Sequence, residues 1–230
     1  MATPTTITVT ANGNQKAAIN SPYLPVSVRV DDENNAPMAG VTVQFLAPSN
    51  HGTWPGGGSL ARNATTNGSG IATSPVFTAN ATTGGFNIQV TAGSVVNQFG
   101  VDFSTVNPAV VTSISAYSGN NQSTPINQPF TSPLVARAAN GLNAPVAGAQ
   151  IVFTAPASGA SCSFPVPFAA TITITTDVNG LATTPQATAN GTTGAYTVSA
   201  TKSGAQTAFF GLTNGAAAAS TVNALSMCEA

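Results

Sequence analysis

The stretch NNAPMAGVTVQFLAP (34–48) returns 108 residues later in the chain as LNAPVAGAQIVFTAP (142–156). A second block, Ala72–Pro75, returns as Ala182–Pro185 at a separation of 110 residues. Solenoid proteins repeat every ~20–50 residues, whereas a separation near 110 matches the size of a small domain. The sequence therefore predicts two copies of one domain.

The repeat also predicts where the domains begin and end. Copy one covers 1–107 and copy two covers 108–215. Within the remaining segment, 216–230, Ser220–Met227 lines up with Ala109–Ala116 at the start of copy two. We therefore expect the C-terminal tail to resemble the first strand of a further repeat.

Both copies alternate apolar and polar residues in short runs such as Val26–Val30, Val41–Phe45 and Phe86–Val90. That period of two is typical of a strand with one buried face, and turn residues separate the runs. Seven such short strands per copy indicate an all-β fold with two tandem antiparallel immunoglobulin-like β-sandwich domains. In copy two the predicted strands are 111–117, 131–139, 148–155, 170–176, 180–188, 194–202 and 205–213.

The same alternation predicts which side chains form the two cores. In copy one these are Val28, Val43, Phe45, Ile88 and Val90, and in copy two they are Ile151, Phe153 and Val198. The pair Phe99–Gly100 matches Phe210–Gly211, which predicts that these residues are equivalent in the last strands.

Composition narrows the function classes. Only 5% of the residues are charged, the net charge is −1, and the five cations are scattered along the chain. Nucleic acids and anionic membranes bind clustered basic residues, so neither is an expected partner. No apolar run reaches the ~20 residues that a membrane span needs, so membrane insertion is not expected. The start, Met1–Pro4, does not read as a signal peptide, so a leader has been removed or was never used.

Catalytic chemistry is not expected. The only histidine, His51, has no counterpart in copy two and no Asp near it in sequence. A Ser-His-Asp arrangement needs a base beside a nucleophile, and no pair of acids recurs in both copies. We therefore predict that the protein is not an enzyme, takes no cofactor, and carries His51 in a surface loop.

One acidic cluster, Asp31, Asp32 and Glu33, is a weak candidate for a calcium site. Calcium takes oxygen ligands from such residues, but copy two has no acid at the matching place. Asp177 begins a second, incomplete fragment of a calcium loop. A solvated turn is the alternative interpretation, and no other metal site is expected.

Trp54, the only tryptophan, lies in a Gly-rich loop and is a candidate for ligand contact, since aromatics at loop tips often mediate recognition. The alternative is that its side chain folds back as a lid on the core of copy one.

The two cysteines, Cys162 and Cys228, permit one disulfide. Alternate strands of a sandwich run the same way, so the third and last strands of copy two end at one pole, and each cysteine follows one of them. We predict a Cys162–Cys228 disulfide. Unpaired or intermolecular thiols are the alternative.

Val222, Leu225 and Met227 make the C-terminal tail apolar. Either the tail is the cut beginning of another repeat, or it docks as a strand on a neighbouring molecule's sheet edge, where main-chain hydrogen bonds supply affinity.

Three segments, 36–45, 65–73 and 84–92, together with their partners in copy two, resemble the bacterial immunoglobulin-like repeat of the invasin and intimin type. The resemblance covers nearly the whole chain. It implies a repeat of a bacterial surface or secreted protein, in which tandem sandwiches form a stalk that presents an adhesive module.

The leading hypothesis is therefore a non-enzymatic extracellular structural or adhesion repeat at the cell surface. Its expected partners are other copies of the repeat and a host or surface ligand. A self-assembling filament subunit joined by strand docking and a virion decoration module are the alternatives.

Overall fold

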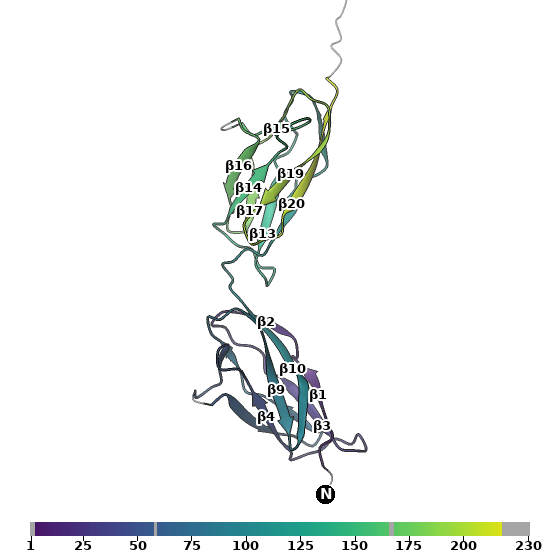
Figure 1. The fold of residues 1–230 in the computed structure, drawn as a ribbon, viewed down its shortest axis with the longest axis vertical. Helices are drawn as coiled ribbons and strands as arrows, with labels where there is room; N and C mark the ends of the chain where they lie inside the picture. The colour runs from purple at the N-terminus through teal and green to yellow at the C-terminus, as the bar shows by residue number, and fades with distance from the viewer. Residues whose placement is uncertain (1–2, 58, 166–167, 218–230) are drawn as a thin grey trace, which may run out of the picture. The chain divides into compact units, whose positions relative to one another are not determined.

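The computed structural model describes residues 3–57, 59–165 and 168–217. It divides into two compact units, Met1–Ala109 and Val110–Ala230. Every regular element in the described residues is a β-strand (Figure 1). Among these residues, no helix is long and apolar enough to cross a membrane.

Copy one consists of two sheets that enclose one core (Figure 1). The three-stranded sheet has the order β1-β3-β7, the five-stranded sheet has the order β2-β10-β9-β4-β6, and β5 pairs with β8 in a small ribbon. The strands are β1 (Thr6–Ala11), β2 (Gln15–Ala18), β3 (Ser27–Asp31), β4 (Thr42–Leu46), β5 (Gly52–Thr53), β6 (Ala61–Thr65), β7 (Ile71–Thr73), β8 (Thr78–Ala79), β9 (Gly84–Ala92) and β10 (Val95–Val106).

Copy two repeats this plan strand for strand. Its sheets have the orders β11-β13-β17 and β12-β20-β19-β14-β16, with β15 paired to β18. The strands are β11 (Ser113–Ser118), β12 (Gln122–Pro125), β13 (Val135–Ala139), β14 (Gln150–Thr154), β15 (Cys162–Ser163), β16 (Thr171–Thr175), β17 (Leu181–Thr183), β18 (Thr188–Ala189), β19 (Gly194–Thr201) and β20 (Ala208–Gly215). The predicted fold class, two tandem immunoglobulin-like sandwiches, is confirmed.

The predicted core register is also confirmed. All the core side chains expected from the alternation are at most 1% exposed; they are Val28, Val43, Phe45, Ile88 and Val90 in copy one, and Ile151, Phe153 and Val198 in copy two. Because neighbouring side chains of a strand point to opposite faces, a slip of one residue would have exposed this whole set.

Each copy departs from a purely antiparallel sandwich at its first strand. In copy two the predicted strand 111–117 is only β11, and the chain then turns through Gly119 (φ 84°) and Asn121 (φ 58°) to form β12. β11 pairs antiparallel with β13, whereas β12 joins the other sheet and runs parallel to the last strand, β20. Copy one does the same, with β2 parallel to β10.

Two further predictions about strands were wrong. The predicted strand 180–188 is two strands, β17 and β18, because Thr184 bonds to Leu134 and Pro185 has no N–H to continue a ladder. The equivalence of Phe99–Gly100 with Phe210–Gly211 also fails, because Val101 pairs with Ile88 as Phe210 pairs with Val198. The register of β10 shifts between Asn97 and Val101, which displaces the match by two residues.

Candidate functional site

The acids of the calcium candidate are used to build a turn. The Arg29 Nε lies 2.8 Å from the Asp31 Oδ1, and the Asp32 Oδ1 accepts the N–H groups of Asn34 and Ala36, both at 2.9 Å. Within the described residues, no group of three or more His, Cys, Asp or Glu side chains could hold a metal ion. Asp31 and Asp32 thus each bond to groups near them in sequence, and the calcium site that would include Glu33 stays a hypothesis.

Copy two shows that the charge of Asp32 is not needed for this turn. Asn140 occupies the equivalent place, and its Oδ1 accepts the N–H groups of Leu142 and Ala144 at 2.9 and 3.1 Å. The reverse exchange occurs at Asp177, whose carboxylate accepts two N–H groups of its own turn, as the amide oxygen of Asn67 does in copy one. At both places an amide oxygen and a carboxylate oxygen thus accept the same two backbone N–H groups of the turn.

Trp54 lies inside copy one and does not project from its loop. Its side chain is 3% exposed, and its Nε1 donates to the Leu60 carbonyl at 2.8 Å. Its ring packs edge-to-face with Phe77, with the ring centroids 5.0 Å apart. The ring of Trp54 therefore covers the core of copy one, as in the second interpretation of the sequence, and it is not exposed to a ligand.

His51 has an aromatic neighbour, and within the described residues its buried Nδ1 has no hydrogen-bond partner. Its ring stacks on Phe86 with the centroids 4.6 Å apart, and its carbonyl accepts the N–H of Asn80. This is a packing position at the end of the sandwich.

Cys162 occupies a core position whose packing differs between the copies. It pairs with Ala189 as Gly52 pairs with Ala79 in copy one. A Cβ placed on Gly52 would lie 2.8 Å from two ring carbons of Phe77 and would meet the Thr78 carbonyl. In copy two the residue equivalent to Phe77 is the small Ala187, so no such ring stands beside Cys162, whose side chain is 3% exposed.

Burial raises the pKa of the Cys162 thiol to about 11. Burial and the adjacent Cys162 raise the pKa of Tyr196 above its ordinary value. Both groups are therefore protonated at neutral pH, and a protonated thiol is a poor nucleophile. The predicted partner, Cys228, lies outside the described residues, so the disulfide stays a prediction.

The docking residues Val222, Leu225 and Met227 also lie outside the described residues. The structure does describe the end of β20, where the buried Asn214 Nδ2 donates to the Ser161 carbonyl at 2.9 Å. The last strand of copy two therefore ends beside the segment that carries Cys162.

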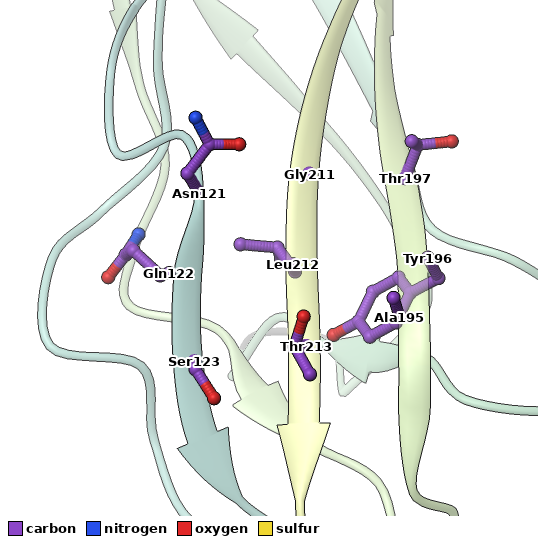
Figure 2. A pocket seen from close by; sticks show the side chains of 9 residues that line it. All are labelled: Asn121, Gln122, Ser123, Ala195, Tyr196, Thr197, Gly211, Leu212 and Thr213. Carbon is purple, nitrogen blue, oxygen red and sulfur yellow. The ribbon is translucent and has the colours of Figure 1, made fainter.

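The outer face of β12, β20 and β19 carries an open hollow of about 510 Å³. Figure 2 shows Asn121 and Ser123 on one side, Gly211 in the middle strand, and Ala195 and Thr197 on the other side. Because Gly211 lacks a side chain, nothing projects from the middle strand into the hollow at this position. No Lys, Arg, His, Asp or Glu is among the residues that line this hollow.

No family model matches the chain, and no curated protein matches it. Solved structures of bacterial adhesins do. The chain is similar to adhesin InvE of Yersinia pseudotuberculosis, with 19% identity and a TM-score of 0.38 over 93% of this chain and 60% of that one. It is also similar to a fragment of intimin in complex with the intimin-binding domain of its translocated receptor, with 16% identity and a TM-score of 0.36 over 93% of this chain and 65% of that one. A third match is invasin, described as a bacterial integrin-binding protein, with 19% identity and a TM-score of 0.38 over 92% of this chain and 40% of that one.

These structures are of the invasin and intimin type that the sequence resembles. The chain spans 40–65% of their lengths. Because the identities and TM-scores are this low, the assignment of the fold rests on the strand order and pairing described above.

Proposed function

We propose that the chain is a non-enzymatic repeat of an extracellular bacterial surface protein, in which the two sandwiches form part of a load-bearing stalk. In this proposal the partners are further repeats of the same protein and, beyond the stalk, a host or surface ligand. The observation that carries the proposal is the parallel pairing, in each copy, of the second strand with the last strand, β2 with β10 and β12 with β20.

A parallel pair of strands near the two ends of a domain resists a pull on the chain. Once β11 has separated from β13, tension applied from the two ends draws β12 toward its own N-terminal end and β20 toward its own C-terminal end. Because the two strands run in the same direction, the pull slides one along the other and loads all the hydrogen bonds between them at once. A ladder loaded in this way is stronger than one whose bonds are opened in turn.

The repeated polar contacts support the same proposal. Thr66 in copy one and Thr176 in copy two each donate to a carbonyl, of Met38 and Val146, at 2.6 and 2.7 Å. Each hydroxyl also accepts the N–H of the residue three positions after that carbonyl, Val41 in copy one and Ala149 in copy two. What the two copies share is therefore a set of contacts that hold loops to the sheets.

Pulling single molecules of the full chain tests this proposal. The Ile126 N–H donates to the Gly215 carbonyl at 3.0 Å, so Ile126→Pro removes one bond between β12 and β20. Ser123→Pro is the matched control. A parallel ladder engages alternate residues, so counting back from Ile126 in steps of two turns the N–H of Ser123 away from β20. Pro125, which has no N–H, falls in the same alternate set as Ser123. We expect Ile126→Pro to lower the rupture force of copy two and Ser123→Pro to leave it unchanged. Equal forces in both variants would contradict the proposal.

A further inference from the structure

The strand β16 forms an unprotected edge of the five-stranded sheet in copy two. It pairs with β14 on one side only, and Figure 1 shows it at the margin of its sheet. Its sequence, Thr-Ile-Thr-Ile-Thr (171–175), contains only β-branched residues and no charge. Proteins usually protect such edges with charges, prolines or bulges, because an open edge is a template for pairing with another chain.

The hydrogen bonds around β16 show which of its backbone groups are open. Ala155 donates to the Ala170 carbonyl, and Thr176 donates to the Ala149 carbonyl. Because antiparallel ladders engage alternate residues, Ile172 and Ile174 bond to β14. The N–H and C=O groups of Thr171, Thr173 and Thr175 therefore point to the free edge.

Copy one protects the equivalent edge. Its edge strand β6 reads Ala-Arg-Asn-Ala-Thr (61–65), so Arg62 and Asn63 stand where copy two has Ile172 and Thr173. The Arg62 guanidinium donates to the carbonyls of Pro55, Gly57, Ser59 and Ala61 at 2.9–3.1 Å. These bonds hold the guanidinium against the segment 55–61 that leads into β6, and a charge on an edge strand is one of the ways in which proteins block pairing.

Two exposed apolar side chains flank the open edge. Among the described residues, Val178 (82% exposed) and Phe168 (80%) are the most exposed of the large apolar side chains. Phe168 precedes β16 and Val178 follows it, each five residues from Thr173. Copy one has glycine at the place of Val178, Gly68, so this flanking feature also belongs to copy two alone.

We propose that β16 is a self-association interface, at which two copies of this chain join their five-stranded sheets edge to edge. A two-fold axis at Thr173 gives an antiparallel pair in which Thr173 lies opposite its own counterpart and Thr171 lies opposite Thr175. Each of these pairs exchanges two N–H···O=C bonds. Phe168 and Val178 lie in the turns at the two ends of β16, so they flank the paired strands.

The sequence of β16 is symmetric about Thr173, which is what an isologous contact requires, because the same surface must complement itself. Ile172 and Ile174 of the two copies then meet as a non-hydrogen-bonded pair, in which side chains approach most closely. A charge within β16 would meet a charge of the same sign across or near the axis, and β16 has none. The occupant that fits best is therefore a second copy of this chain.

Sedimentation equilibrium of the full chain, in reducing buffer to exclude intermolecular disulfides, tests the proposal. We expect a reversible dimer whose population rises with concentration. Thr173→Lys places two like charges opposite each other and should weaken the dimer by about tenfold or more. Asn63→Lys makes the same change at the protected edge and should leave the dimer unchanged. Thr173→Pro, which removes an N–H that faces the free edge, should act like Thr173→Lys.

The converse change opens the protected edge. Arg62→Ile combined with Asn63→Thr gives copy one an edge like that of β16, and we expect species larger than a dimer. A chain that stays monomeric up to about 1 mM, or a dimer that Thr173→Lys leaves intact, would overturn the proposal. The inference does not rest on the load-bearing role, since the pulling experiment reports on single molecules and this one on association.

Discussion

The two copies fill one core position differently. Copy one has the small Gly52 beside the large Phe77, whereas copy two has the larger Cys162 and the small Ala187. This difference predicts how a double substitution in copy one behaves. Gly52→Cys introduces a side chain whose Cβ would lie 2.8 Å from the Phe77 ring. Overpacking a core in this way costs about 1–3 kcal/mol. Phe77→Ala removes a ring that is 2% exposed, and truncating a buried Phe costs about 3–5 kcal/mol.

The double variant Gly52→Cys/Phe77→Ala should lose less stability than the sum of the two single variants. The thiol then occupies part of the space that the ring vacates. The rescue should be partial, because the Thr78 carbonyl also lies against a Cβ at Gly52 and does not move with the ring. We expect a coupling free energy of about 1–2 kcal/mol between the two sites, within the range seen for residues in contact.

Urea unfolding followed by tryptophan fluorescence measures these free energies. The chain has one tryptophan, and Trp54 is buried in copy one, so the signal reports the unfolding of that copy alone. Additivity of the two single losses within about 0.5 kcal/mol would show that the space is not shared and would refute this interpretation of Cys162.

Four other predictions follow from the structure. Phe153→Ala should destabilise copy two by about 3–5 kcal/mol, measured by urea unfolding followed by circular dichroism, and a loss under about 1 kcal/mol would contradict the core register. Because burial raises the pKa of Cys162 from 9.0 to about 11, the unfolded chain gives up this proton first as the pH rises. The stability that this thiol contributes is therefore complete below pH 9 and is lost toward about pH 11, and Cys162→Ala should reduce that alkaline loss. In the unsubstituted chain at pH 8, a free Cys162 should resist alkylation until urea is added, whereas the predicted Cys162–Cys228 disulfide would leave no free thiol even in urea. Calcium should leave the melting temperature unchanged, because Asp31 pairs with Arg29 and the Asp32 carboxylate accepts two backbone N–H groups, and a rise in melting temperature that Asp32→Asn abolishes would revive the calcium site.

The core could be predicted from the sequence because strand alternation has a strict period of two, and one register buries Val43, Phe45, Ile151 and Phe153 together. The division of the first strand could not. Gly119 and Asn121 look like an ordinary turn in sequence, and only the paired positions show that the chain changes sheets there.

The candidate site was harder to predict, because each of its residues depends on a contact distant in sequence. Trp54 is buried because Phe77 lies beside it, and Cys162 is a core residue because Ala187 leaves room for it. The alternation of residues 171–175 was visible in the sequence, but its position at a sheet edge follows from the topology alone.

The role of the parallel strands is tested most directly by pulling copy two in two directions. With attachment at Val110 and Ala216, the force first loads β11 against β13 and then slides β12 along β20. With attachment at Asn127 and Ala216, the force acts at the same end of both strands and opens their bonds one after another. The load-bearing account predicts a clearly higher rupture force for the first pair of attachments than for the second, and equal forces in both directions would contradict it.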